Sequence, residues 1–306
     1  MSAVLTTGTG TGTEYEPAAE PVAGAKRRAW VPYVQLLPGG VWLLLFFALP
    51  VGLLAQSTLW DPSGSLEQGY ALTWRWQNFT DGLSTYSDQF IRSLEYSLIA
   101  TVICLVIGYP LAYAIAIKGG RWKNLMLIAV IAPFFTSFLV RTLAWKTILS
   151  DSGFVVDALR WLHVFGPDDR LLATNIAVIA GITYNFLPFM VLPLYASLEK
   201  LDPRLLEAAG DLYANPVKTF WKVTLPLSMP GVVGGTLMTF IPAAGDYINA
   251  ELLGSPSTTM IGNVIQSQYQ RVGDIPVGAA LSFTLMAGIL IMVFAYVRKA
   301  GTDEVV

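Results

Sequence analysis

Residues 96–117 read YSLIATVICLVIGYPLAYAIAI and contain no Asp, Glu, Lys or Arg. A bilayer core of about 30 Å needs a helix of about 20 mostly apolar residues, so this stretch is long enough to cross a membrane. Five more charge-free runs occur, at residues 29–60, 124–140, 171–198, 223–245 and 275–297. The pattern predicts an all-α membrane protein with six transmembrane helices.

The composition supports a membrane protein and excludes several other classes. Hydrophobic residues make up 54% of the chain and charged residues 13%, against roughly a quarter charged in soluble domains. The net charge of -2 provides no basic field for nucleic acid. One cysteine, Cys104, and one histidine, His163, are too few for a disulfide or for most metal sites. We therefore expect a packed cysteine, a solvated loop histidine and no bound metal.

The six spans are expected at residues 36–59, 94–117, 124–149, 173–198, 227–249 and 276–297, within a transmembrane domain of residues 29–300. The third span is extended past Arg141, because an arginine near a helix end can reach the headgroups. Residues 1–28, rich in Thr, Gly, Glu, Pro and Ala, are predicted to be a disordered tail, and residues 301–306 a short second tail. The alternative for the N-terminal region is a secretory signal cleaved near Ala55.

The orientation follows from the Lys and Arg residues, which favour the cytoplasmic side of short loops. With the N-terminus inside, twelve of the nineteen fall on that side. They are Lys26, Arg27, Arg28, Lys118, Arg121, Lys123, Lys200, Arg204, Lys218, Lys222, Arg298 and Lys299. Both termini are therefore predicted to be cytoplasmic.

The cytoplasmic loop at residues 199–226 carries two helix starts. Asp202 precedes Pro203, and Asn215 precedes Pro216; in each pair the first residue suits an N-cap and the proline the first helical position. Two short helices are expected. The first has an apolar face formed by Leu201, Leu205, Ala208, Ala209 and Leu212. This face could bind a partner protein, or the pair of helices could lie on the headgroups.

The loop resembles a known family motif. Glu207-Ala208-Ala209, followed by Val223 and Leu225-Pro226, is similar to the EAA loop of type I ABC-importer permeases. The resemblance implies the type I permease fold, with a coupling helix that docks on a cytoplasmic ATPase. The residues that it assigns to this coupling are Glu207, Ala208, Ala209, Gly210, Asp211, Tyr213, Asn215 and Pro216. Tyr213 stands where the family has a glycine suited to a left-handed helix end, and Asn215 offers another way to complete the turn.

Further segments resemble the first permease subunit of spermidine/putrescine importers. They are residues 132–141, 184–190, 241–246, 260–266 and 276–280. The resemblance implies a permease that moves polyamines into the cytoplasm through the cell membrane by alternating access. It also implies a second homologous permease, two copies of an ABC ATPase that holds ATP and Mg, and an extracytoplasmic substrate-binding protein. The chain has no Gly-x4-Gly-Lys-Ser/Thr loop, so we expect it to be no enzyme and to bind no cofactor itself.

A polyamine path should offer carboxylates, polar oxygens and aromatic faces. The candidates, placed by depth along the spans, are Asp246, Tyr247, Tyr184, Asn185, Thr136, Ser137, Arg141 and Trp145. Each has a plainer interpretation. Asp246 could be an acid at the water boundary, Asn185 an interhelical hydrogen-bonding residue, and Trp145 part of an interfacial belt. Arg141 could pair with Asp246 or extend to the headgroups.

Other functions remain open at this point. The same kind of importer could carry ferric ion, thiosulfate or another small solute. An ATP-independent secondary transporter would usually place ionisable residues at mid-membrane, whereas the charged residues here lie at or beyond the span ends. A membrane hydrolase has no support, because neither a His-Glu-x-x-His nor a Gly-x-Ser-x-Gly motif occurs.

Overall fold

The computed structural model describes residues 31–65, 67–166 and 168–300. The chain divides into two compact units, residues 1–51 and 52–306. The predicted tails at residues 1–28 and 301–306 lie outside the described residues. From the first unit, α1 (Val31–Leu43) continues through a π-helical turn, η1 (Leu44–Ala48), into α2 (Leu49–Ser57), most of which belongs to the second unit. The segment Gln35–Ser57 is long and apolar enough to cross a membrane, as expected for the first span.

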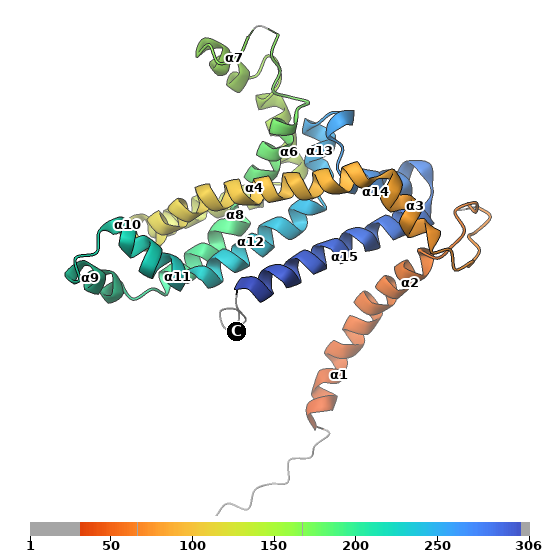
Figure 1. Cartoon of the computed structure of the whole chain (residues 1–306), viewed down its shortest axis with the longest axis horizontal. Coiled ribbons are helices and arrows are strands. Elements are labelled where there is room, and N and C mark those ends of the chain that lie inside the picture. The colour runs from red at the N-terminus through yellow and green to blue at the C-terminus, as the bar shows by residue number, and fades with distance from the viewer. Residues whose placement is uncertain (1–30, 66, 167, 301–306) are drawn as a thin grey trace, which may run out of the picture. The chain divides into compact units, whose positions relative to one another are not determined.

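The second unit is built on α4 (Ser87–Tyr113), α8 (Asn175–Glu199), α12 (Met229–Ala244) and α15 (Ile275–Ala300), which run alongside one another in Figure 1. Glycines let α8 and α12 approach closely, as in many membrane bundles. A Cβ at Gly235 would lie 3.0 Å from the Met190 carbonyl oxygen, and one at Gly231 would lie 2.8 Å from the Pro193 carbonyl oxygen. The core of the unit therefore lies where α4, α8 and α12 meet.

Two of the expected spans are broken rather than straight. In the third, α5 (Lys123–Ile131) and the 3-10 turn η4 (Ala132–Phe135) meet α6 (Phe138–Ile148) at 95°. Pro133 lies in η4, and Thr136 then takes an extended conformation, which ends the hydrogen-bonded helix. At the fifth, the bend falls where the expected span begins: the helices of Pro216–Leu227, which lie mostly in the predicted loop at residues 199–226, meet α12 at 67°. The described residues thus contain four membrane-length helices, or up to six spans if each bent pair is one span.

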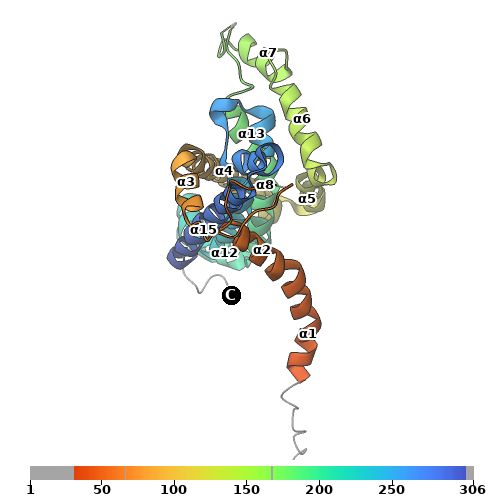
Figure 2. The same ribbon diagram turned by 90° about the vertical axis from the view of Figure 1, so that its right-hand side faces the viewer.

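Short helices extend from both ends of the bundle in Figure 1, and Figure 2 faces the end that carries α3. One end carries α3 (Gln77–Thr85), α13 (Ile248–Leu253), η6 (Pro256–Thr258), α14 (Ile261–Ser267) and η7 (Gln268–Val272), and α7 (Phe154–Trp161) follows α6. The other end carries η2 (Ala114–Lys118), η3 (Gly120–Trp122), α9 (Pro203–Asp211), α10 (Pro216–Thr219), η5 (Phe220–Thr224) and α11 (Leu225–Leu227). This second end holds most of the lysines and arginines that the sequence assigns to the cytoplasm.

Candidate functional site: an exposed helical loop and a buried polar network

The two short helices of the loop begin where the sequence predicts. Asp202 caps α9, since its side chain accepts a hydrogen bond from the Arg204 amide at 3.0 Å. Asn215 caps α10 in the same way, with the Lys218 amide at 2.8 Å. Each side-chain oxygen satisfies one of the amides that a helix start leaves without a partner. The loop is therefore a built element with defined ends.

Tyr213 ends α9 in the left-handed conformation. Its φ is +57°. The Tyr213 amide donates to the Gly210 carbonyl oxygen at 2.9 Å, and the Ala214 amide donates to the Ala209 carbonyl oxygen at 3.0 Å. This is the Schellman pattern of helix ends, for which glycine is the usual residue. Tyr213 thus takes the left-handed conformation that suits the family's glycine, and the alternative that Asn215 completes the turn is wrong, because Asn215 starts the next helix.

α9 turns only part of its apolar face toward the bundle. Ala209 is buried and Leu206 is half-buried, whereas Leu205, Ala208 and Leu212 are exposed. Beside them the acids Glu207 and Asp211 and the ring of Tyr213, which is 97% exposed, are also uncovered. An exposed strip that combines apolar and acidic side chains on a capped helix has the character of a docking surface.

A buried polar network lies near the opposite end of the bundle. Asn185 in α8 donates from Nδ2 to Thr142 Oγ1 in α6 and to Asn249 Oδ1 in α13, both at 3.1 Å. The Asn249 backbone amide donates to Asp246 Oδ1 at 3.1 Å, and its Nδ2 donates to Asp246 Oδ2. Asp246 is only 6% exposed, so within this chain it is not an acid at the water boundary. Asn185 does make the interhelical hydrogen bonds considered for it.

Arg141 has neither of the environments expected for it. It is 8% exposed, and its guanidinium carbon lies 5.4 Å and 5.6 Å from the ring centroids of Phe134 and Phe138. Among the described residues it forms no ion pair, and its Nε and Nη1 atoms have no hydrogen-bond partner. The pairing with Asp246 and the extension to the headgroups are therefore both wrong for this chain, because the bend before α6 turns Arg141 toward aromatic rings.

The other candidates lie in different surroundings. Thr136 and Ser137 are exposed at the break between η4 and α6. The rings of Trp145 and Tyr184 lie 5.3 Å apart, and both residues line an apolar cavity of about 530 Å³. Tyr247 is partly exposed beside Asp246. Cys104 is packed as expected, and its thiol donates to the Thr183 carbonyl oxygen. The structure brings only Asp246 and Asn185 into one network.

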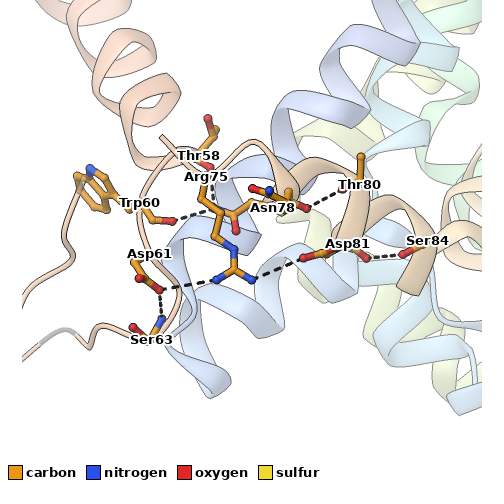
Figure 3. Close-up of polar contacts among 10 residues, drawn as sticks. Thr58, Trp60, Asp61, Ser63, Arg75, Asn78, Thr80, Asp81 and Ser84 are labelled. Carbon is orange, nitrogen blue, oxygen red and sulfur yellow. Dashed lines mark hydrogen bonds and ion pairs between the residues drawn. The ribbon is translucent and has the colours of Figure 1, made fainter. Parts of the chain in front are cut away.

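Polar contacts join described residues of the loop between α2 and α3, and Figure 3 shows them. Arg75 lies 4.0 Å from a carboxylate oxygen of Asp61 and 3.8 Å from one of Asp81. The buried Asn78 donates from Nδ2 to the Thr58 and Trp60 carbonyl oxygens, at 2.8 Å each. Hydrogen bonds from Ser63 hold the pKa of Asp61 below its ordinary value, and the nearby Arg75 guanidinium lowers it further. The loop is thus fixed to the start of α3.

Sequence reasoning missed several of these residues. Thr142 and Asn249 complete the buried network, and Asn78 and Arg75 hold the loop before α3. The spacing of Asp246 and Asn249, three residues apart, is the signal that could have indicated a cap, because a side chain often accepts from the amide three residues on. No comparable signal marks Thr142, which joins the network only through the bend of the third span.

Membrane-length helices in one bundle, with capped helices outside it, define a multi-pass membrane protein. The chain belongs to the family described as "Binding-protein-dependent transport system inner membrane component", whose model matches residues 105–300. It is 39% identical over 261 residues to the spermidine/putrescine transport system permease protein PotB of Escherichia coli, which covers 85% of this chain and 94% of that protein. The PotB of Haemophilus influenzae is 38% identical over 258 residues, 84% of this chain and 90% of that protein.

Solved structures share the fold. A chain of the bacterial alginate ABC transporter, solved with a periplasmic protein bound to an alginate pentasaccharide, matches with a TM-score of 0.65 and 20% identity. The match covers 90% of this chain and 96% of that chain. The type I ABC-importer permease fold expected from the EAA loop is thereby supported, and the protein is a multi-pass inner-membrane protein.

Proposed function

We propose that this chain is the transmembrane permease subunit of an ATP-driven ABC importer that moves polyamines, spermidine or putrescine, into the cytoplasm. The observation that carries the proposal is the 39% identity to PotB over 85% of the chain. The loop with α9 supports the energy-coupling part. Its exposed Glu207, Leu212 and Tyr213 form a surface on which a separate ATPase can dock.

The partners follow from this role. A second homologous permease completes the pore, two ATPase copies bind ATP and Mg below it, and an extracytoplasmic binding protein delivers the cargo to the outer loops. The chain itself holds no ATP site and no cofactor, and both its termini are cytoplasmic in a six-span arrangement. ATP drives transport only if it binds one transmembrane conformation more tightly than the other.

The cargo path is assigned to Asp246 and Asn185 of the buried network and to the other candidates placed by depth along the spans. Asp246 and Tyr247 supply a carboxylate and an aromatic ring, the two groups that attract ammonium. Trp145 and Tyr184 add a pair of rings 5.3 Å apart, and Thr136, Ser137 and Asn185 add polar oxygens. Arg141 is the one cation among these candidates. Its positive charge repels a polycation, which favours release of the cargo over its retention.

The test is the ATPase activity of the complex, co-expressed with its neighbouring subunits and reconstituted in lipid with its binding protein. Polyamines, ferric ion and thiosulfate are compared. Stimulation by a polyamine that is lost in Glu207→Ala, but kept in the exposed control Asp157→Ala, is the expected result. Stimulation only by another solute would contradict the assignment of a polyamine as the cargo. Failure of any ATPase to co-purify would overturn the importer role and favour a secondary transporter.

A further inference from the structure

A groove of about 1000 Å³ lies between α4 and the loop that carries α9. Leu105, Val106 and Pro110 form its wall on α4, and Leu206 and Trp221 form part of the wall on the loop. Lys118, the last residue of η2, also lines it. The groove is therefore apolar along its length and has a cation at one end.

The length of the groove matches one leaflet of a bilayer. From Leu105 to Lys118 the chain advances thirteen residues along α4 and η2, which is about 20 Å at 1.5 Å per residue. One leaflet is about 20 Å thick when its headgroup region is included. Since Lys118 marks the end of the membrane-length helix Ser87–Lys118, the groove extends from headgroup depth to about the middle of the membrane.

The charge at the headgroup end is free to bind an anion. Within the described part of the chain, Lys118 forms no ion pair and no side-chain hydrogen bond. None of the described residues that line the groove is acidic. Lys218 and Lys222 lie on α10 and η5, elements that contribute to the opposite wall, but Lys118 is the cation that lines the groove itself. A basic end above an apolar groove is the arrangement that holds an anionic lipid headgroup between helices.

We propose that an anionic phospholipid occupies this groove, with an acyl chain along Val106 and Pro110 and its phosphate on Lys118. The lipid contacts α4 on one side and the α9 loop on the other, so it holds the loop against the bundle. Its effect on ATPase coupling rests on the proposed function, whereas its binding does not.

The experiment measures phospholipid retained by the purified complex, using native mass spectrometry after exchange into mixed phosphatidylcholine and phosphatidylglycerol nanodiscs. We expect phosphatidylglycerol to be retained in preference, and its amount to fall several-fold in two unlike variants. Lys118→Gln removes the charge, and Val106→Trp fills the apolar part. The matched controls are Lys299→Gln, at the same end of α15, and Val102→Trp, four residues earlier on α4. Val106 is 66% exposed and Val102 is 52% exposed, but only Val106 lines the groove.

Three results would overturn the lipid site. They are equal retention of both lipids, unchanged retention in both groove variants, and cross-linking of Val106→Cys to the second permease, which would show that protein covers the groove. If no ATPase co-purifies but phosphatidylglycerol retention still falls in Lys118→Gln, the proposed function fails and the lipid site stands. If the ATPase co-purifies and its activity responds equally to both lipids, the effect on coupling fails.

Discussion

The ammonium nitrogen of Lys123 lies 2.6 Å from a carboxylate oxygen of Glu199, so an ion pair joins the start of α5 to the end of α8. The same ammonium lies 5.3 Å from the centroid of the Tyr195 ring, close enough for a cation–π contact. Because the third span is broken after η4, this pair fixes its first half to the continuous helix α8. The contact is at the end of the bundle that carries the α9 loop.

Reversing one charge of this pair should weaken the attachment. Lys123→Glu places two carboxylates side by side, and we expect a lower midpoint of thermal unfolding. The added change Glu199→Lys should recover most of the loss. The midpoint can be followed by reaction of a maleimide dye with Cys104, the only cysteine, which is buried. Lys146→Glu, on the exposed part of α6, is the control. An equal loss in the double variant would contradict the ion pair.

Tyr213→Gly should stabilise the end of α9. A non-glycine residue in the left-handed region costs about 1–2 kcal/mol, and glycine removes that strain at some cost in chain entropy. We expect a gain of up to about 1 kcal/mol in the free energy of unfolding, and weaker co-purification of the ATPase, because the exposed ring belongs to the proposed docking surface. Ala214→Gly, next along the chain and without a positive φ, should give no gain. Lower stability of Tyr213→Gly would contradict the strain at this position, and unchanged co-purification would mean that the ring makes no contact with the ATPase.

Local patterns in the sequence predict much of this fold, and the remainder depends on contacts between distant segments. Charge-free length predicts the membrane helices, and Asp-Pro and Asn-Pro predict the two caps, because both signals act within one helix. The 95° break at Thr136 and the burial of Arg141 depend on how α6 packs against α8. Likewise, the sequence leaves Asp246 as a possible boundary acid, because its burial depends on Asn249, which donates to it and accepts from the distant Asn185.

Gly181→Ala should separate α8 from α13. A Cβ at Gly181 would lie 2.7 Å from Asn249 Oδ1 and would also overlap Leu253 Cδ1. Neither neighbour can move easily, because Leu253 is fully buried and Asn249 is held in the polar network. We expect a loss of about 1–3 kcal/mol, measured by the Cys104 reaction. In Gly288→Ala, where a Cβ meets nothing within 4 Å, stability should be unchanged or higher.

Asn78→Ala should release the loop that precedes α3. The substitution removes the two hydrogen bonds to the Thr58 and Trp60 carbonyl oxygens. Leaving buried carbonyls without donors costs about 1–3 kcal/mol. We expect faster chymotrypsin cleavage at the exposed Trp74 and Trp76. Thr80→Ala, which removes an exposed hydroxyl from the same helix, should leave the cleavage rate unchanged, and equal rates in both variants would contradict a fixing role for Asn78.

The losses of stability caused by changing Asp246 and Asn249 should be strongly non-additive. Asn249→Ala leaves the buried Asp246 carboxylate without its side-chain donor, at a cost of about 1–3 kcal/mol or more. Removing both groups leaves no such orphan, so Asp246→Ala with Asn249→Ala should cost less than the sum of the single changes. Stability is measured by the reaction of Cys104 with the maleimide dye. The control is Asn124→Ala, a change at an exposed residue of α5.

Polyamine uptake per folded protein then separates the roles of Asp246. If the double variant is stable but its uptake is reduced severalfold, Asp246 contacts cargo; if uptake is unchanged, Asp246 serves only to hold α13 in place. Additive losses would show that the two residues do not depend on each other.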